Sequence, residues 1–282
     1  MKAMHRTLLA LAVVFAAPLL HSQASESAIY KQIGKLHSLS ETERPKATIK
    51  IATDIKSLPA GKSKLEIADQ LAHLVTQGDQ GDEARQAVAD ALSQALAQSP
   101  EPEKAGQPAP PYFDLAKLVR YERVHSTLVD PEYAKAGKVL FDQDAEIERT
   151  DFTLQDLHGK KYTFSELRGK IVVINFWTTR CSPCRREMPD LDLLYTHFQD
   201  QGLVVLSITD EAPFAVNAYL APTGYHPPVL IDTDSKVHGL FHVDGTPRTF
   251  VFDRKGNLVG KGIDQCTQQQ FLQMLSNTDL HP

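Results

Sequence analysis

The spacing of hydrophobic residues changes near residue 150 of the 282-residue chain. Before that point, apolar residues recur every three or four positions, which is the period of an amphipathic helix. After it, short runs of consecutive or alternating apolar residues predict β-strands that are separated by helical stretches. The pattern therefore predicts an all-α N-terminal domain followed by an α/β domain.

The first half of the chain contains a series of amphipathic stretches. Ser40 and Glu43 have the spacing of a capping box, and the apolar stripe that follows them predicts a helix. A second stripe stops at Gly78, and a third, rich in alanine, begins after Asp82. We interpret residues 25–98 as a small helical bundle, and a partner-binding or dimerisation arm is the alternative.

A proline-rich segment separates the two halves. Residues 99–111 (SPEPEKAGQPAPP) lack an apolar period, which is typical of an extended linker. One connecting helix is predicted after Tyr112 and is bounded by Pro131, whereas residues 139–149 predict no element. The domains expected from these patterns are a signal peptide (1–24), a helical domain (25–98), a Pro-rich linker with a connecting helix (99–145) and a second domain (146–282).

The second domain alternates between strands and helices. Its predicted elements are a hairpin (152–164), a buried strand (171–177), a helix (182–199), a strand (203–208), a helix (213–221), a strand (228–231), a hairpin (248–260) and a helix (268–275). Strand–helix–strand alternation followed by an antiparallel pair predicts a mixed sheet flanked by helices.

Composition narrows the functional classes. The chain is 42% hydrophobic and 23% charged, and its length suffices for two domains of ordinary size. The formal net charge is -5. A nucleic acid partner is not expected, because phosphate binding requires clustered lysine and arginine.

The N-terminus has the pattern of a secretory signal peptide. A short basic start precedes an apolar core over residues 8–20, and small residues lead up to a cleavage point near Ala24. A retained membrane anchor is the alternative, although the apolar run is short for a span. We therefore expect an extracytoplasmic, periplasmic location in a bacterium. In such an oxidising space a CxxC pair is more often redox-active than zinc-binding.

Cys181 and Cys184 form such a CxxC pair. They follow the buried strand predicted over residues 171–177 and stand at the start of a predicted helix. Free N–H groups and the positive end of the helix dipole favour a thiolate over a thiol at this place. A zinc half-site is the first alternative, but the sequence contains no second cysteine pair or close histidine pair. A permanent structural disulfide is the second alternative.

The order of motifs in residues 151–275 resembles the thioredoxin fold, and more closely the extracytoplasmic thiol-disulfide oxidoreductases of the TlpA/ResA type. The matching motifs are Gly169-Lys170, Asn175-Phe176-Trp177, Cys181-Ser182-Pro183-Cys184, Glu187-Met188-Pro189, Asp232-Thr233-Asp234, Gly245-Thr246-Pro247 and Asp253-Arg254-Lys255-Gly256. They span about half of the chain, and the helical half lies outside the resemblance.

The resemblance implies a role for each matching residue. Cys181 is expected to attack the substrate disulfide and Cys184 to resolve the mixed disulfide that results. The two cysteines then form a redox-active disulfide, with no metal and no other cofactor. Pro247 is expected to be a cis-proline facing the disulfide, next to a Thr246 backbone that pairs with an extended substrate segment. Trp177 is expected to contribute to the core and the wall of the substrate site.

Glu187 matches an acid that ResA-like members carry three residues after the second cysteine. On a helix it shares a face with Cys184, where a carboxylate raises the pKa of the thiol and exchanges its proton. Asn175 stands where thioredoxin has a buried aspartate. Proton handling is therefore expected to fall to Glu187, or to Asp210 and Glu211.

Two further positions leave alternatives open. Arg180 replaces a tryptophan that often precedes the first cysteine, and its charge is expected to line the substrate site and to favour the thiolate of Cys181. This leaves the direction of electron flow open. Cys266 precedes a capping box formed by Thr267 and Gln270, so it is interpreted as an apolar staple residue, with a third redox thiol as the alternative.

The resemblance implies a thiol-disulfide oxidoreductase that reduces the disulfide bonds of specific extracytoplasmic proteins, as in cytochrome c maturation or metallochaperone maintenance. The expected partners are protein disulfides and a membrane thiol donor that recharges the pair. A thiol peroxidase is a rival within the fold, although the Pro/Thr-rich loop around a lone peroxidatic cysteine is missing from the sequence. A binding module, in which the helical domain carries the function and the dithiol is incidental, is the rival from another class.

Overall fold

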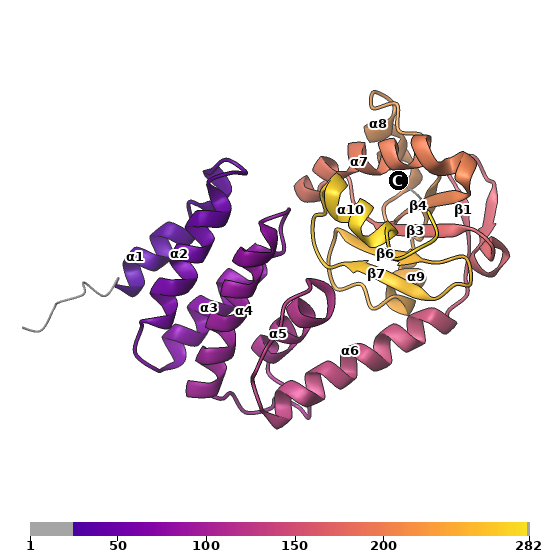
Figure 1. Cartoon of the computed structure of the whole chain (residues 1–282). Helices are drawn as coiled ribbons and strands as arrows, with labels where there is room; N and C mark the ends of the chain where they lie inside the picture. The colour runs from indigo at the N-terminus through magenta and orange to yellow at the C-terminus, as the bar shows by residue number, and fades with distance from the viewer. Residues whose placement is uncertain (1–24, 281–282) are drawn as a thin grey trace, which may run out of the picture.

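A computed structural model describes residues 25–280, so the expected signal peptide (1–24) lies outside the described residues. Figure 1 shows the helical half, in indigo and magenta, beside a sheet covered by helices. The helices of the first half are α1 (Glu26–Ile33), η1 (Leu36–Ser38, a short 3-10 helix), α2 (Arg44–Lys56), α3 (Lys62–Val75), α4 (Gly81–Gln98), α5 (Pro110–Tyr121) and α6 (Pro131–Arg149). Within residues 25–280, no helix combines the length and apolar character that a bilayer span requires.

The helical half has a hydrophobic core of its own. The alanine-rich face of α4, with Ala91 and Ala95, lies buried in that core. Tyr112 and Leu115 of α5 are buried in the same core. The segment after the proline-rich stretch therefore packs into the helical half, which the sequence pattern did not indicate.

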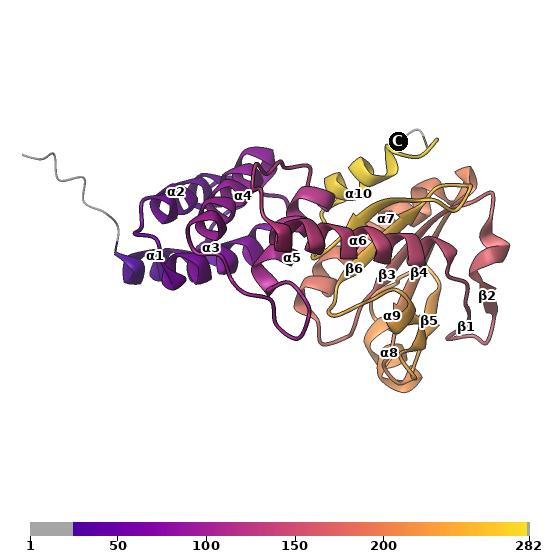
Figure 2. The same ribbon diagram turned by 90° about the horizontal axis from the view of Figure 1, so that it is seen from below.

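Helix α6 connects the two halves, as both views show (Figures 1 and 2). Ala136 and Leu140, near its beginning, are buried in the helical core, whereas Ile147, near its end, is buried under the sheet. The helix expected after Tyr112 is present as α5 and ends before Pro131, but residues 139–149, for which no element was expected, belong to a second helix, α6. Pro131 begins a second helix, because Asp130 caps the free N–H groups of its first turn and proline fits that turn.

The second half is built on a mixed sheet, as predicted. Its strands are β1 (Thr153–Asp156), β2 (Lys161–Thr163), β3 (Ile171–Phe176), β4 (Leu203–Thr209), β5 (Val229–Ile231), β6 (Arg248–Phe252) and β7 (Leu258–Gly262). Their order across the sheet is β2-β1-β5-β4-β3-β6-β7. Strand β3 pairs in parallel with β4 and antiparallel with β6, and both predicted hairpins are present. This is the thioredoxin-like arrangement expected from the motifs.

Helices cover both faces of this sheet. The further elements are η2 (Phe164–Leu167), α7 (Ser182–Phe198), η3 (Gln199–Gln201), α8 (Pro213–Leu220), α9 (Lys236–Leu240) and α10 (Gln268–Leu275). Strand β3 is buried along its whole length. Ile171 and Val173 pack in the core under α7 and α10, whereas Val172 and Ile174 pack on the opposite face. Burial on both faces explains the continuous apolar run in the sequence.

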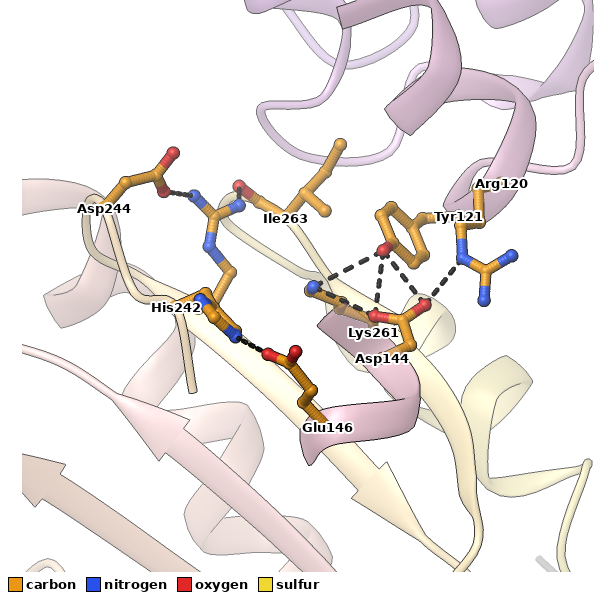
Figure 3. Close-up of polar contacts among 9 residues, drawn as sticks. Arg120, Tyr121, Asp144, Glu146, His242, Asp244, Lys261 and Ile263 are labelled. Carbon is orange, nitrogen blue, oxygen red and sulfur yellow. Dashed lines mark hydrogen bonds and ion pairs between the residues drawn. The ribbon is translucent and has the colours of Figure 1, made fainter. Parts of the chain in front are cut away.

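A polar network joins the two halves at the centre of Figure 3. Asp144 of α6 is 7% exposed. It accepts hydrogen bonds from Arg120 Nε at 2.6 Å and from the Tyr121 hydroxyl at 3.0 Å, both of the helical half. Lys261 of β7 approaches the same carboxylate to 3.3 Å. The sheet and the helices are thus held together by paired buried charges.

Candidate active site

Cys181 and Cys184 form a disulfide at the beginning of α7, with an S–S distance of 1.95 Å. Cys181 is the N-cap residue, and its Sγ accepts a hydrogen bond from the Cys184 N–H at 3.1 Å. Cys184 is fully buried, whereas Cys181 is partly exposed. The first cysteine is therefore the one that an external sulfur can reach, and the helix terminus favours its thiolate.

The loop before β6 faces this disulfide. The Thr246–Pro247 peptide bond is cis, as the sequence predicted. The carbonyl oxygen of Thr246 lies 3.6 Å from Cys181 Sγ. The loop that carries the cis-proline thus lies next to the sulfur of Cys181, the partly exposed cysteine of the pair.

Trp177 forms a wall behind the disulfide. Its side chain is fully buried and belongs to a small apolar cluster with Cys184, Met188 and Val216. Its ring lies 5.8 Å from that of Tyr219. The expectation that Trp177 contributes to the core is supported, but contact with a substrate is not, because the closed cluster leaves the indole no surface.

Glu187 is buried on α7, one turn after Cys184. Its carboxylate accepts hydrogen bonds from Asn175 Nδ2 at 2.7 Å and from the Cys266 N–H at 2.9 Å. Burial nevertheless dominates, and it raises the pKa of Glu187 to about 8. An acid that keeps its proton at neutral pH can exchange it with a nearby thiol. The Cys266 N–H could not be found from the sequence, because a backbone donor carries no signal of residue type.

The two other acids expected as proton carriers have different surroundings. Glu211 accepts hydrogen bonds from the Thr179 N–H at 2.5 Å and from the Thr179 hydroxyl at 2.9 Å. It therefore holds the loop that leads into Cys181. Asp210 accepts a hydrogen bond from the Ser235 hydroxyl at 3.4 Å. Of the three acids, Glu187 is the one buried on the helix that carries the cysteines.

Arg180 extends into solvent. Its side chain is 92% exposed, and its Nε lies 3.9 Å from Glu211 Oε1. Water and this carboxylate screen its positive charge, so its effect on Cys181 is expected to be small. An exposed position is compatible with contact to a substrate.

Cys266 lies beside the site as a buried free thiol. The predicted capping box between Thr267 and Gln270 is present, and Cys266 shares a core cluster with Phe271. Burial raises the pKa of this thiol well above its usual value, which keeps it protonated. These contacts agree with the staple interpretation.

Among residues 25–280, one group of side chains could hold a metal ion, and neither disulfide cysteine belongs to it. Asp69, His73 and Asp114 place one ligand atom each within 4.8 Å of one another on α3 and α5. Asp114 is paired with Lys117 at 3.4 Å, so a metal ion would compete with the lysine for the Asp114 carboxylate.

The chain is similar to several known proteins. A model of the AhpC/TSA family matches residues 147–261. The thiol-disulfide oxidoreductase ResA of Bacillus thuringiensis (strain Al Hakam) is 36% identical over 157 residues, which cover 55% of this chain and 86% of the relative. ResA of Bacillus subtilis (strain 168) is 36% identical over 110 residues, covering 39% of this chain and 62% of the relative. A crystal structure of the exposed lipoprotein thioredoxin Etrx1 from Streptococcus pneumoniae is 28% identical, with a TM-score of 0.42, and covers 45% of this chain and 98% of that one.

Proposed function

The chain belongs to the family of ResA thiol-disulfide oxidoreductases, and we propose that it reduces disulfide bonds of extracytoplasmic proteins through Cys181 and Cys184. The observation that carries this proposal is the hydrogen bond from the Cys184 N–H to Cys181 Sγ. In the reduced protein the same N–H, at a helix terminus, stabilises negative charge on the sulfur. Cys181 is therefore the proposed nucleophile.

The reaction proceeds in two exchanges. The Cys181 thiolate attacks one sulfur of the substrate disulfide, and the other substrate sulfur leaves as a thiolate. Cys184 then attacks Cys181 Sγ, which breaks the mixed disulfide and releases the second substrate thiol. Two electrons pass from the cysteine pair to the substrate, and the pair ends as a disulfide. Because both cysteines start the same helix, the second attack is intramolecular and fast.

Glu187 supplies the proton exchange for the resolving cysteine. Cys184 is buried, so its thiol cannot lose a proton directly to water. Glu187 lies one turn further along the same helix, and its pKa of about 8 is close to that of a thiol. Acid and thiol can therefore share a proton near neutral pH. This matching of pKa values supports Glu187 as the group that activates Cys184.

The surroundings of the pair favour reduction over oxidation. Strong oxidants of this kind stabilise their thiolate form, which makes the disulfide easy to reduce. Here the cation beside the loop, Arg180, is 92% exposed and paired with Glu211. Glu187, which is buried and holds its proton at neutral pH, adds no positive charge that would stabilise a thiolate at Cys184. Both features support a pair that gives electrons away.

Thr246 and Pro247 are proposed to bind the substrate backbone. The Thr246 carbonyl lies at the partly exposed sulfur, so an extended substrate segment that pairs with this loop brings its own sulfur close to Cys181. A membrane thiol donor is proposed to recharge the oxidised pair. The N-terminal sequence pattern supports release into the periplasm.

A thiol peroxidase receives little support, although the AhpC/TSA model matches part of the chain. A peroxidatic thiolate must meet peroxide from solvent. Cys184 is fully buried and is joined to Cys181 in the disulfide.

The proposal predicts which single-cysteine variant traps substrates. In a chain with Cys184→Ser and Cys266→Ser, only Cys181 remains, so mixed disulfides with substrates should persist because no resolving thiol exists. The reduced variant is incubated with an oxidised periplasmic extract, and the adducts are separated by non-reducing electrophoresis. The matched control carries Cys181→Ser and Cys266→Ser, leaves only the buried Cys184, and should trap at least tenfold less.

The same experiment reports the direction of electron flow. Adducts that form directly with the reduced variant come from substrate disulfides, as expected of a reductase. Adducts that form only after Cys181 has been activated with a small disulfide come from substrate thiols and would reverse the direction. Equal trapping by both variants, or none by either, would leave the binding module as the better account.

A further inference from the structure

One peptide unit connects the helical half to the acid of the redox site. It is the unit between Gln265 and Cys266, in the loop that leads from β7 to α10. Its carbonyl accepts a hydrogen bond from the Gly78 N–H at 3.0 Å. Its N–H, on Cys266, donates to Glu187 Oε2 at 2.9 Å. Gly78 follows α3, so this chain of two hydrogen bonds begins in the helical half and ends on α7.

The two hydrogen bonds reinforce each other. A peptide group whose carbonyl accepts a hydrogen bond becomes a stronger donor through its N–H, because the group is polarised as a whole. The effect is largest where water is excluded, and both Glu187 and Cys266 are buried. The Gln265 side chain is also held, by Arg186 Nε at 2.9 Å. The loop therefore has a fixed position against α7.

We infer that the helical half is a positioning element for the redox site, which holds the Gln265–Cys266 peptide so that it donates to Glu187. This gives the helical half a role in the reaction that acts through Glu187. The inference rests on the proposed function, because it matters only if Glu187 exchanges a proton during the reaction.

Several groups face Glu187 and act on its titration together with this peptide. Asn175 of β3 donates to the other carboxylate oxygen. Asp190 of α7 and Asp264 of the same loop add negative charge and raise the pKa of Glu187. The neutral groups are the free thiol of Cys266 and the hydroxyl of the half-buried Tyr225, which is hydrogen-bonded to Ser207 at 2.7 Å.

Besides Arg186, a second cation, Arg248 of β6, contacts this loop. It pairs with Asp244 at 2.5 Å and donates to the Ile263 carbonyl. Figure 3 labels Asp244 and Ile263, the two residues that this guanidinium contacts. The two contacts of Arg248 do not involve Gly78, so they are expected to persist in a Gly78 variant.

The first test follows the amide protons of the full chain by NMR as pH is raised through the titration of Glu187. The Cys266 and Gly78 amide signals should shift together with one midpoint, since both N–H groups belong to one hydrogen-bond chain. The Gly81 amide, at the first residue of α4 and hydrogen-bonded to Asp79, should not follow them. In Glu187→Gln the common shift should disappear.

The second test changes the backbone at Gly78. Its φ of +77° is a conformation that valine does not adopt, whereas asparagine tolerates it. Gly78→Val should displace the N–H and raise, by about 1, the apparent pKa seen in the pH profile of glutathione disulfide reduction. Gly78→Asn should keep the pH profile of the unmodified protein. Gly81→Val is the matched control, because Gly81, the first residue of α4, has a φ of +76°.

The outcomes separate the two proposals. If Glu187→Gln leaves the pH profile of the reaction unchanged, the proposed role of Glu187 fails. If Glu187→Gln changes that profile while the Gly78 amide does not follow the titration and Gly78→Val behaves as the unmodified chain, only the positioning role fails. The NMR titration uses the native sequence, so it decides the question even where Gly78→Val does not fold.

Discussion

At the scale of single residues, the site depends on one acid that is buried and forms no ion pair with a cation among residues 25–280. Glu187 has two hydrogen-bond donors, yet burial raises its pKa to about 8 from an ordinary value of 4.5. The folded protein therefore binds this proton more tightly than the unfolded chain does. The associated stability is fully present below about pH 4.5 and is lost as the pH rises to about 8.

Glu187→Gln should remove this pH dependence. The variant keeps a side chain of the same shape but carries no titrating proton. The unmodified protein should lose stability relative to the variant between about pH 4.5 and about pH 8, by at most about 5 kcal/mol. Urea unfolding at a series of pH values measures the difference. Glu41→Gln, at an exposed position, should follow the unmodified protein, and a constant difference for Glu187→Gln would contradict the assigned burial effect.

The residues of the site differed in how well the sequence predicted them. The CxxC spacing after a buried strand was sufficient for Cys181 and Cys184, because local order fixes their place at a helix N-terminus. The position of Glu187 followed from the same helix. Its contact with Cys266 joins positions 79 residues apart, and no local pattern encodes such a backbone contact.

At the scale of elements, the junction of β7 and α10 depends on a close approach at Gly262. A Cβ at this position would lie 2.5 Å from Cys266 Sγ, which is far inside van der Waals contact. Gly262→Ala should therefore destabilise the protein by about 1–3 kcal/mol through overpacking.

The cause can be isolated with a second substitution. In a Cys266→Ala background the sulfur is gone, so Gly262→Ala should cost less than it does alone. A double-mutant cycle measured by chemical denaturation gives the coupling between the two positions. Strict additivity of the two substitutions would show that the sulfur is not the obstacle.

Helix α6 shows why one element escaped prediction. Its buried positions Ala136, Leu140, Asp144 and Ile147 follow the helical period, but an aspartate interrupts the apolar stripe. The burial of Asp144 is possible only because the partners Arg120 and Lys261 come from other elements. A prediction based on hydrophobic periodicity alone therefore misses a helix whose interface is partly ionic. Helix α9 has only five residues, too few for a period to be recognised.

At the scale of the whole molecule, the helical and sheet halves are expected to unfold together. Besides the Asp144 network, Glu146 pairs with His242 at 3.1 Å, and Glu148 accepts from the Leu258 N–H at 2.9 Å (Figure 3 shows the first of these). All three acids lie on α6, which is buried at one end in each core. If α6 detaches from either core, apolar surface becomes exposed on the helix and on that core. The division of the chain into two domains remains a proposal that unfolding can test.

Asp144→Ala should uncouple the two halves. It leaves Lys261, whose side chain is only 10% exposed, without the carboxylate that balances its charge. Removing one partner of a buried pair costs about 3–5 kcal/mol. The single tryptophan, Trp177, reports unfolding of the sheet half by fluorescence, whereas far-UV circular dichroism also follows the helical half. The two curves should coincide in the unmodified protein and separate in Asp144→Ala.

Two controls identify the buried charge as the cause. Asp142→Ala removes an exposed neighbour on α6 that pairs with Lys138, and should change stability by less than about 1 kcal/mol. Asp144→Leu combined with Lys261→Met removes both charges and keeps apolar volume, so it should recover most of the lost stability. Coincident curves in Asp144→Ala would mean that the halves are held together without this network. Separation would mean that the buried charges around Asp144 couple the unfolding of the helical half to that of the sheet half.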